Sequence, residues 1–157
     1  MEVSVTNQPT VMLVGDDTVE WGVDCKIYNP SNIYRCKIGD RVRVGPFTEI
    51  QDGCDIGDDT VICSHAFLAN NTVIGKRCFV GHGVLTCNDR NPIANNRGWF
   101  CERIVVGDDV SIGSGAILMP GVTIGNRCSI GAGAIVTKNV VADSIAYNKI
   151  ELVVRSR

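Results

Sequence analysis

Residues 106–138 read VGDDVSIGSGAILMPGVTIGNRCSIGAGAIVTK, with a branched aliphatic residue at every sixth position. The same interval runs through an earlier stretch, from Ile38 to Val80. The aliphatic positions are Ile38, Val44, Ile50, Ile56, Ile62, Leu68, Ile74, Val80, Val106, Ile112, Leu118, Ile124, Ile130 and Val136. Four residues after each of them stands a more compact residue, such as Cys54 or Ala134, and we expect both positions to point inward. A short fixed period predicts a repeat architecture.

The period of six favours strands over helices. Glycine often follows the aliphatic residue, as at Gly45 and Gly81, and we expect it where the backbone turns a corner and needs freedom in φ. An amphipathic helix would repeat near every 3.6 residues and would not accept so many glycines. Three hexapeptides make one triangular coil of 18 residues, and coils stack at the strand spacing of about 4.8 Å. The sequence therefore predicts an all-β fold, a left-handed parallel β-helix that forms a single domain over residues 1–157.

Most of the eight cysteines follow the repeat rather than a metal-binding or redox pattern. No two of them form a Cys-x-x-Cys pair, which is the usual spacing of zinc sites and of disulfide exchange. With 18 residues to a coil, Cys36 lies under Cys54, while Cys54, Cys78 and Cys128 occupy the compact inward position. Free cysteine behaves as a small hydrophobic residue, so we expect packing roles and no metal.

Three segments depart from the period. Residues 14–18 fit one hexapeptide and residues 32–36 fit only at Cys36, which predicts imperfect first coils that cap the array. Residues from about 86 to 105 are polar and rich in turn-forming residues, and this predicts an inserted loop. From about 142 to 157 the period is lost again, which indicates a C-terminal extension containing a strand or a brief helix.

Charge and hydropathy exclude two classes of partner. The 15 basic and 17 acidic side chains are interspersed and give a net charge of −2, so no basic stripe favours nucleic acid. No apolar run is long enough to span a membrane, and the first residues lack the basic and apolar regions of a signal peptide. We therefore expect a cytoplasmic protein without a membrane partner.

His65 and His82 are the only histidines, and they lie 17 residues apart. The coil length places them on adjacent coils and on the same side of the solenoid. Histidine can accept a proton at neutral pH, as activation of an amine or hydroxyl nucleophile requires. The inserted loop carries Asn88, Arg90 and Trp99, and insertions in solenoids often organise binding. This combination favours a catalytic site beside the loop over two ordinary exposed histidines and a tolerated surface excursion.

A strip of small side chains continues from the histidines if residues 86–91 count as a hexapeptide. The same side then carries Gly113-Ser114-Gly115 and Gly131-Ala132-Gly133, whose small size suits the backbone approach of an extended ligand. Gly113, Ser114 and Ala132 are accordingly candidate cofactor contacts. If the whole insertion lies outside the coil count, this strip falls on another face.

Two segments resemble a known family. IGSGAILMPGVTIGNRCSIGAGAIVTK, at residues 112–138, is similar to the C-terminal coils of hexapeptide-repeat acetyltransferases. Residues 81–92, which end in TCNDRNP, resemble the loop entry of the sugar N-acetyltransferases that make diacetamido uronic acids. The resemblance implies transfer from acetyl-CoA to a nucleotide-linked amino sugar, as in lipopolysaccharide biosynthesis. It also implies a homotrimer with the coenzyme in the groove between adjacent β-helices.

The resemblance assigns roles to individual residues. Asn88 matches the family's loop-entry asparagine, and Lys138 matches the lysine that lies toward the phosphate end of the coenzyme. His65 stands where the sugar N-acetyltransferases carry asparagine, whereas other branches use a histidine base. We expect His65 to take the proton of the attacking amine, and His82, Asn88 and Arg90 to contact the sugar or its pyrophosphate. Proton removal by the departing coenzyme thiolate is the alternative.

Other functions are compatible with the fold. O-acetylation of a sugar or another small acceptor would use the same base chemistry. A structural or ice-binding solenoid would need long ladders of one exposed residue, whereas the outward positions here mix Asp, Arg, Lys and Asn. The carbonic-anhydrase branch of this fold binds its metal through three histidines, and one chain here supplies two.

Overall fold

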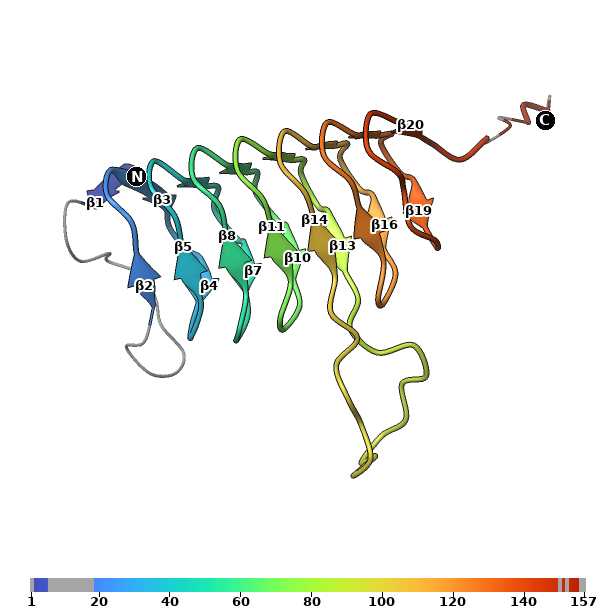
Figure 1. Cartoon of the computed structure of the whole chain (residues 1–157), viewed down its shortest axis with the longest axis horizontal. Coiled ribbons are helices and arrows are strands. Elements are labelled where there is room, and N and C mark those ends of the chain that lie inside the picture. Colours follow the sequence, from blue (N-terminus) through green and yellow to red (C-terminus); the bar gives the residue numbers. More distant parts are fainter. Residues whose placement is uncertain (1, 6–18, 150, 152, 156–157) are drawn as a thin grey trace.

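The computed structural model describes residues 2–5, 19–149, 151 and 153–155, and it is a left-handed β-helix of about seven turns. Figure 1 shows the coils stacked along the long axis, with one long loop projecting from the side. Each complete coil contributes one short strand to each of three faces, and neighbouring coils pair in parallel. The hexapeptide period and the all-β prediction are thereby confirmed.

We number the faces in the order in which the chain visits them from β2 onward. The first face holds β2 (Glu20–Trp21), β5 (Lys37–Ile38), β8 (Asp55–Ile56), β11 (Val73–Ile74), β14 (Val105–Val106) and β17 (Thr123–Ile124). The second holds β1 (Glu2–Val5), β3 (Cys25–Tyr28), β6 (Arg43–Val44), β9 (Val61–Ile62), β12 (Phe79–Val80), β15 (Ser111–Ile112), β18 (Ser129–Ile130) and β20 (Ile145–Ala146). The third holds β4 (Asn32–Ile33), β7 (Glu49–Ile50), β10 (Phe67–Leu68), β13 (Leu85–Thr86), β16 (Ile117–Leu118) and β19 (Ile135–Val136). β1 pairs with β3 and is antiparallel to it.

The core is a column of aliphatic side chains inside the triangular coil. Every predicted aliphatic position is buried, and the inward cysteines Cys36, Cys54, Cys78 and Cys128 are at most 3% exposed. The register pairs Lys37 with Asp55, so Cys36 lies beside Cys54 as predicted. Burial removes these side chains from water at the usual gain of about 25 cal/mol per Å² of apolar surface.

The glycines after the aliphatic residues act differently from our expectation. Their φ angles are not among the positive values, which fall two residues later in each turn, as at Phe47 and His65. A Cβ on Gly45 would lie 2.5 Å from the backbone nitrogen of Ser64, and one on Gly81 would lie 2.6 Å from that of Ser114. Glycine is therefore required at these positions because successive coils approach too closely for a side chain, and not for freedom in φ.

The ends of the array change the coil length. In the first coil Ile33, rather than Asn32, takes the aliphatic position, and it pairs with Ile50 at a spacing of 17 residues. At the other end β20 pairs Ala146 with Ile130, so stacking continues past residue 142, where we had expected the extension to begin. The hexapeptide predicted at residues 14–18 lies outside the described residues.

The inserted loop interrupts one corner and leaves the phase of the coil intact. β13 ends at Thr86 and β14 begins at Val105, so residues 87–104 form the loop. Val80 pairs with Ile112, which means that Thr86 completes the coil in the aliphatic position. Thr86 is 2% exposed and its hydroxyl accepts a hydrogen bond from the Ala69 nitrogen at 2.7 Å. Thr86 therefore counts as a coil position, and the strip of small side chains lies on the same side as the histidines.

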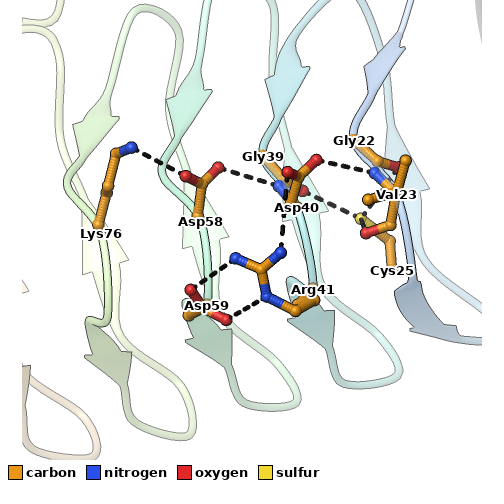
Figure 2. Close-up of polar contacts among 9 residues, drawn as sticks. All are labelled: Gly22, Val23, Cys25, Gly39, Asp40, Arg41, Asp58, Asp59 and Lys76. Atoms are coloured by element: carbon orange, nitrogen blue, oxygen red, sulfur yellow. Dashed lines mark hydrogen bonds and ion pairs between the residues drawn. The ribbon is translucent and has the colours of Figure 1, made fainter.

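A ladder of charges stabilises the corner between the first and second faces. Figure 2 shows Arg41 forming a two-pronged pair with Asp59 of the next coil, with nitrogen-to-oxygen distances of 2.6 and 2.8 Å. Arg77 pairs in the same way with Asp109, and Arg127 with Asp143. At the preceding position Asp58 accepts from the Asp40 nitrogen at 3.0 Å and from Lys76 at 2.8 Å. Charge therefore alternates from coil to coil along this edge.

The described residues contain no helix that is long and apolar enough to cross a bilayer.

Candidate active site

Both histidines lie at the corner between the second and third faces, which we call the histidine corner. Its turns are Pro46-Phe47, Ser64-His65, His82-Gly83, Ser114-Gly115 and Ala132-Gly133. The hydroxyl oxygen of Ser64 lies 2.8 Å from Nδ1 of His82 in the next coil. His65 stacks on Phe47, with ring centroids 5.0 Å apart and planes inclined by 15°. The prediction that the histidines share one side of adjacent coils is confirmed.

A concave pocket of about 270 Å³ opens beside His82. Its walls come from the second face and the histidine corner: Tyr28, Arg43, Gly45, Pro46, Val61, Ile62, Cys63, Ser64 and His82. The lining carries one guanidinium and no carboxylate, and Arg43 makes no ion pair with any carboxylate in the described part of the chain. Burial raises the pKa of the Cys63 thiol, with a smaller opposing effect from Arg43, so this thiol is held in its unreactive neutral form.

The strip of small residues follows His82 directly. Gly115 donates its N–H to the His82 carbonyl at 2.8 Å, and Gly133 donates to the Ser114 carbonyl at 2.8 Å. A Cβ built on Gly83, Gly115 or Gly133 would meet no atom within 4 Å, so the surface above them is open. Ser114 and Ala132 are exposed on this strip, whereas Gly113 packs against the backbone of Ala132. The backbone here can be approached by an extended ligand.

The remaining predicted residues lie at another corner, between the third and first faces, which we call the loop corner. Asn88 contacts Asn70 of the preceding coil at 3.5 Å. Arg90 pairs with Glu102 at 2.9 Å and donates to the Pro120 carbonyl at 2.6 Å, which fastens the base of the loop. Lys138 is exposed on the last turn of this corner.

One chain thus divides the predicted set between two corners. His65, His82, Gly113, Ser114 and Ala132 share the histidine corner, and Asn88, Arg90 and Lys138 share the loop corner. The loop therefore does not lie beside the histidines of its own chain. Sequence reasoning missed Ser64 and Arg43, although the spacing of 18 residues between Ser64 and His82 was a usable signal.

The inward cysteines away from this corner are buried in the core column. Within the described residues, no three His, Cys, Asp or Glu side chains gather as a metal site would require. Burial raises the pKa values of Cys36 and Cys54 to about 12, so both stay protonated at neutral pH. This protonation fits their predicted role in packing.

The hexapeptide repeat is similar to that of a bacterial transferase family. Residues 35–70 and 103–138 match the family model described as bacterial transferase hexapeptide (six repeats). These segments cover coils on both sides of the inserted loop, including Ser64, His65 and Ser114. A search of curated proteins gave no significant sequence match.

Solved acetyltransferase structures share the solenoid. A hexapeptide-repeat acetyltransferase of Vibrio cholerae with acetyl-CoA is 23% identical over 73% of this chain and 64% of its own, with a TM-score of 0.55. Serine acetyltransferase isoform 3 of Entamoeba histolytica with cysteine is 26% identical over 67% of this chain and 36% of its own, with a TM-score of 0.55. AntD, an N-acyltransferase of Bacillus cereus with dTDP and 3-hydroxybutyryl-CoA, is 18% identical over 84% and 81% of the two chains, with a TM-score of 0.55. This chain spans less than two thirds of the first two structures.

Proposed function

We propose that this protein is an acetyl-CoA-dependent N-acetyltransferase that acts on a nucleotide-linked amino sugar. The observation that carries the proposal is the histidine corner, where a hydrogen-bonded histidine separates a concave pocket from an open strip of backbone. The strip accommodates the extended arm of the coenzyme, and the pocket accommodates the acceptor. The match to a transferase repeat supports a group-transfer reaction.

The reaction joins the acceptor nitrogen to the acetyl carbonyl carbon and releases the coenzyme as a thiol. A neutral amine attacks the thioester, and a histidine of this corner takes the proton as the tetrahedral intermediate forms. Collapse of the intermediate breaks the carbon–sulfur bond, and the proton passes to the departing sulfur. Backbone N–H groups of the corner are suited to stabilise the oxyanion. His65 is the base expected from the sequence, and His82 lies in the next coil of the same corner.

The acceptor class follows from the charge of the pocket. Arg43 is exposed, and no carboxylate shares the pocket wall with it. An anionic acceptor could therefore form an ion pair with Arg43 without breaking an existing ion pair. A nucleotide diphosphate linked to an amino sugar meets this requirement. The dTDP bound to AntD and the polysialic acid specificity of another structural neighbour, NeuO, are compatible precedents on the same fold. Such precursors of surface polysaccharide are made in the cytoplasm, where we place this protein.

We further propose a homotrimer in which two chains complete each site. The histidine corner and the loop corner border opposite edges of the third face, so one chain alone does not join them. The outward side chains between these edges are apolar in four consecutive coils: Phe67, Leu85, Ile117 and Ile135. A neighbouring copy that covers this face would bring its own loop, with Asn88 and Arg90, toward the histidines.

Arg90 and Lys138 have more restricted roles in this assembly. Arg90 is already held by Glu102, so its contact with a sugar or pyrophosphate requires exchange of that pair, whereas Asn88 is half-buried and has only the long contact with Asn70. Lys138 lies at the C-terminal end of the loop corner, where it would meet the phosphate end of a coenzyme held between two chains.

The test is thiol release from acetyl-CoA in the presence of UDP- and dTDP-linked 3-amino and 4-amino hexoses. Turnover of one amino sugar supports the proposal, and turnover only of hydroxyl acceptors would replace it with O-acetylation. Ser114→Trp fills the strip and should raise KM for acetyl-CoA strongly. Ser111→Trp, an exposed serine of the same coil on the second face, is the matched control and should change it little. Absence of both turnover and coenzyme binding would favour a non-catalytic solenoid.

A further inference from the structure

The two histidines of the corner have different surroundings. The His65 ring lies against Phe47, and its own backbone has a φ of 62°. The His82 ring is held through Nδ1 by the Ser64 hydroxyl at 2.8 Å. An aromatic stack fixes the plane of a ring but leaves the proton on either nitrogen. A hydrogen bond to one ring nitrogen orients the ring and biases which of the two nitrogens carries the proton.

We infer that His82, positioned by Ser64, is the residue that takes the proton from the acceptor, in place of His65. This inference rests on the proposed acetyl transfer. His82 is the catalytic residue because it lines the acceptor pocket, and Ser64 is a positioning residue because it acts through the His82 ring. His65 is not among the residues that line the pocket.

The hydrogen bond is compatible with the tautomer that a base requires, because a serine hydroxyl can accept as well as donate. With Nδ1–H donating to the Ser64 oxygen, Nε2 carries the lone pair and can accept a proton. Once Nε2 is protonated, Nδ1–H still donates to the same oxygen, so the bond is kept through the step. The proton then passes from Nε2 to the coenzyme sulfur as the carbon–sulfur bond breaks. The amine loses one proton, the sulfur gains it, and His82 returns to its starting form.

The position of His82 in the fold suits this role. Along the corner its turn lies between Ser64, which borders the pocket, and Ser114, which begins the open strip. Gly115 donates to the His82 carbonyl, so the backbone that carries the base also anchors the strip. The acceptor in the pocket and the thioester on the strip therefore meet at His82. His65 lies one coil earlier, with Phe47 covering one side of its ring.

Matched substitutions separate the two histidines. His82→Asn and His65→Asn remove one imidazole each, and asparagine tolerates the positive φ of residue 65. Both variants are assayed for thiol release with the amino sugar that the unmodified protein turns over. We expect His82→Asn to lower kcat by about 10²–10⁴-fold, the usual worth of general-base catalysis, with little change in KM for acetyl-CoA. His65→Asn should retain most of kcat.

The positioning role of Ser64 is tested by the tautomer of His82, which would not change if Ser64 were only structural. In protein labelled with ¹⁵N-histidine, the imidazole shifts of His82 should report the Nδ1–H tautomer, with His65→Asn used for assignment. Ser64→Ala should lose that tautomer and about tenfold in kcat, as expected for one hydrogen bond of ordinary strength. Ser64→Thr keeps the hydroxyl and should restore both. Unchanged tautomer and kcat in Ser64→Ala would overturn the positioning role.

The outcomes distinguish the inference from the function on which it rests. Loss of kcat in His65→Asn with activity kept in His82→Asn would overturn the inference and leave the acetyltransferase intact. Full activity in both variants would also overturn it and assign proton removal to the coenzyme thiolate. If the unmodified protein turns over no acceptor, the proposed function itself fails and the inference falls with it.

Discussion

At the scale of single residues, thiols and hydroxyls of the inward positions bind carbonyls of the next coil. Cys78 donates to the Gly107 carbonyl at 3.1 Å, and Cys128 donates to that of Val141 at 3.0 Å. Thr60 does the same to Gly75 at 2.9 Å. Each of these groups is small enough for the corner and still supplies a donor to a carbonyl. This dual property explains why cysteine and threonine alternate with valine there.

Burial makes the inward thiols inert in the folded protein. The pKa values of Cys36 and Cys54 are raised to about 12, and the thiolate is the reactive form. We expect iodoacetamide at pH 8 to leave both unlabelled until denaturant is added, as mass spectrometry would record. Cys87, which is partly exposed, is the internal control and should react first. Equal labelling of Cys36 and Cys87 in the native protein would contradict the buried assignment.

Glycine at the contact between coils gives a second prediction at this scale. Gly81→Ala places a methyl group 2.6 Å from the Ser114 nitrogen, and both groups are backbone-fixed. We expect a loss of about 1–3 kcal/mol in the free energy of unfolding, as for other overpacked sites, measured by urea titration. Gly98→Ala in the loop has only the Asn96 side chain near it, at 3.5 Å, and should change stability little. Equal effects would refute the close-approach explanation.

At the scale of elements, the corner between the first and second faces shows how short strands are held in register. Two-residue strands offer few hydrogen bonds each, and the Arg–Asp pairs tie one turn to the next at an exposed edge. The pairs lie at the positive-φ position of the turn, as Arg41 and Asp59 show. Because the charge alternates, each coil presents a charge opposite to that of the next coil, which favours their native stacking. Exposed pairs of this kind stabilise only modestly.

The pH dependence of stability should report these pairs. Hydrogen bonds from Arg41, Arg77 and Arg127 lower the pKa values of Asp59, Asp109 and Asp143 from their ordinary value of 3.8. A lowered native pKa contributes stability that is present above the unfolded pKa and lost as pH falls through the native one. The melting temperature should therefore decrease as the pH is lowered below about 4. The decrease should be less steep in Asp109→Asn than in the unmodified protein. Glu151→Gln, which changes an exposed carboxylate, is the control, and its melting temperature should decrease as steeply as that of the unmodified protein. An equally steep decrease in Asp109→Asn would contradict the prediction.

At the scale of the whole molecule, one corner carries the histidines and the other carries the loop. The hexapeptide period was sufficient to predict the fold, the stacked cysteines and the histidines on one side. The period could not place the loop relative to the histidines. The coil phase after the insertion depends on whether Thr86, a polar residue, occupies an aliphatic position, as it does in the structure. The period also could not separate two reasons for glycine, or reveal the Ser64–His82 bond, which depends on side-chain rotamers.

The apolar column on the third face predicts how copies of the chain assemble. Leu85 is 40% exposed in the middle of the apolar column on the third face, so Leu85→Asp would place a charge in the proposed contact between chains. We expect the proposed trimer to dissociate in sedimentation velocity and turnover to fall with it. Ser111→Asp on the second face is the matched control and should leave both unchanged. A Leu85→Asp protein that remains trimeric would move the interface elsewhere.

A crystal structure with bound coenzyme A tests the account most directly. We predict that the coenzyme sulfur lies beside His82 and that the pantetheine arm runs over Gly115 and Gly133 toward the C-terminal coils. The pocket with Arg43 should remain open for the acceptor. Coenzyme bound away from the histidine corner, or with its sulfur remote from His82, would contradict the account.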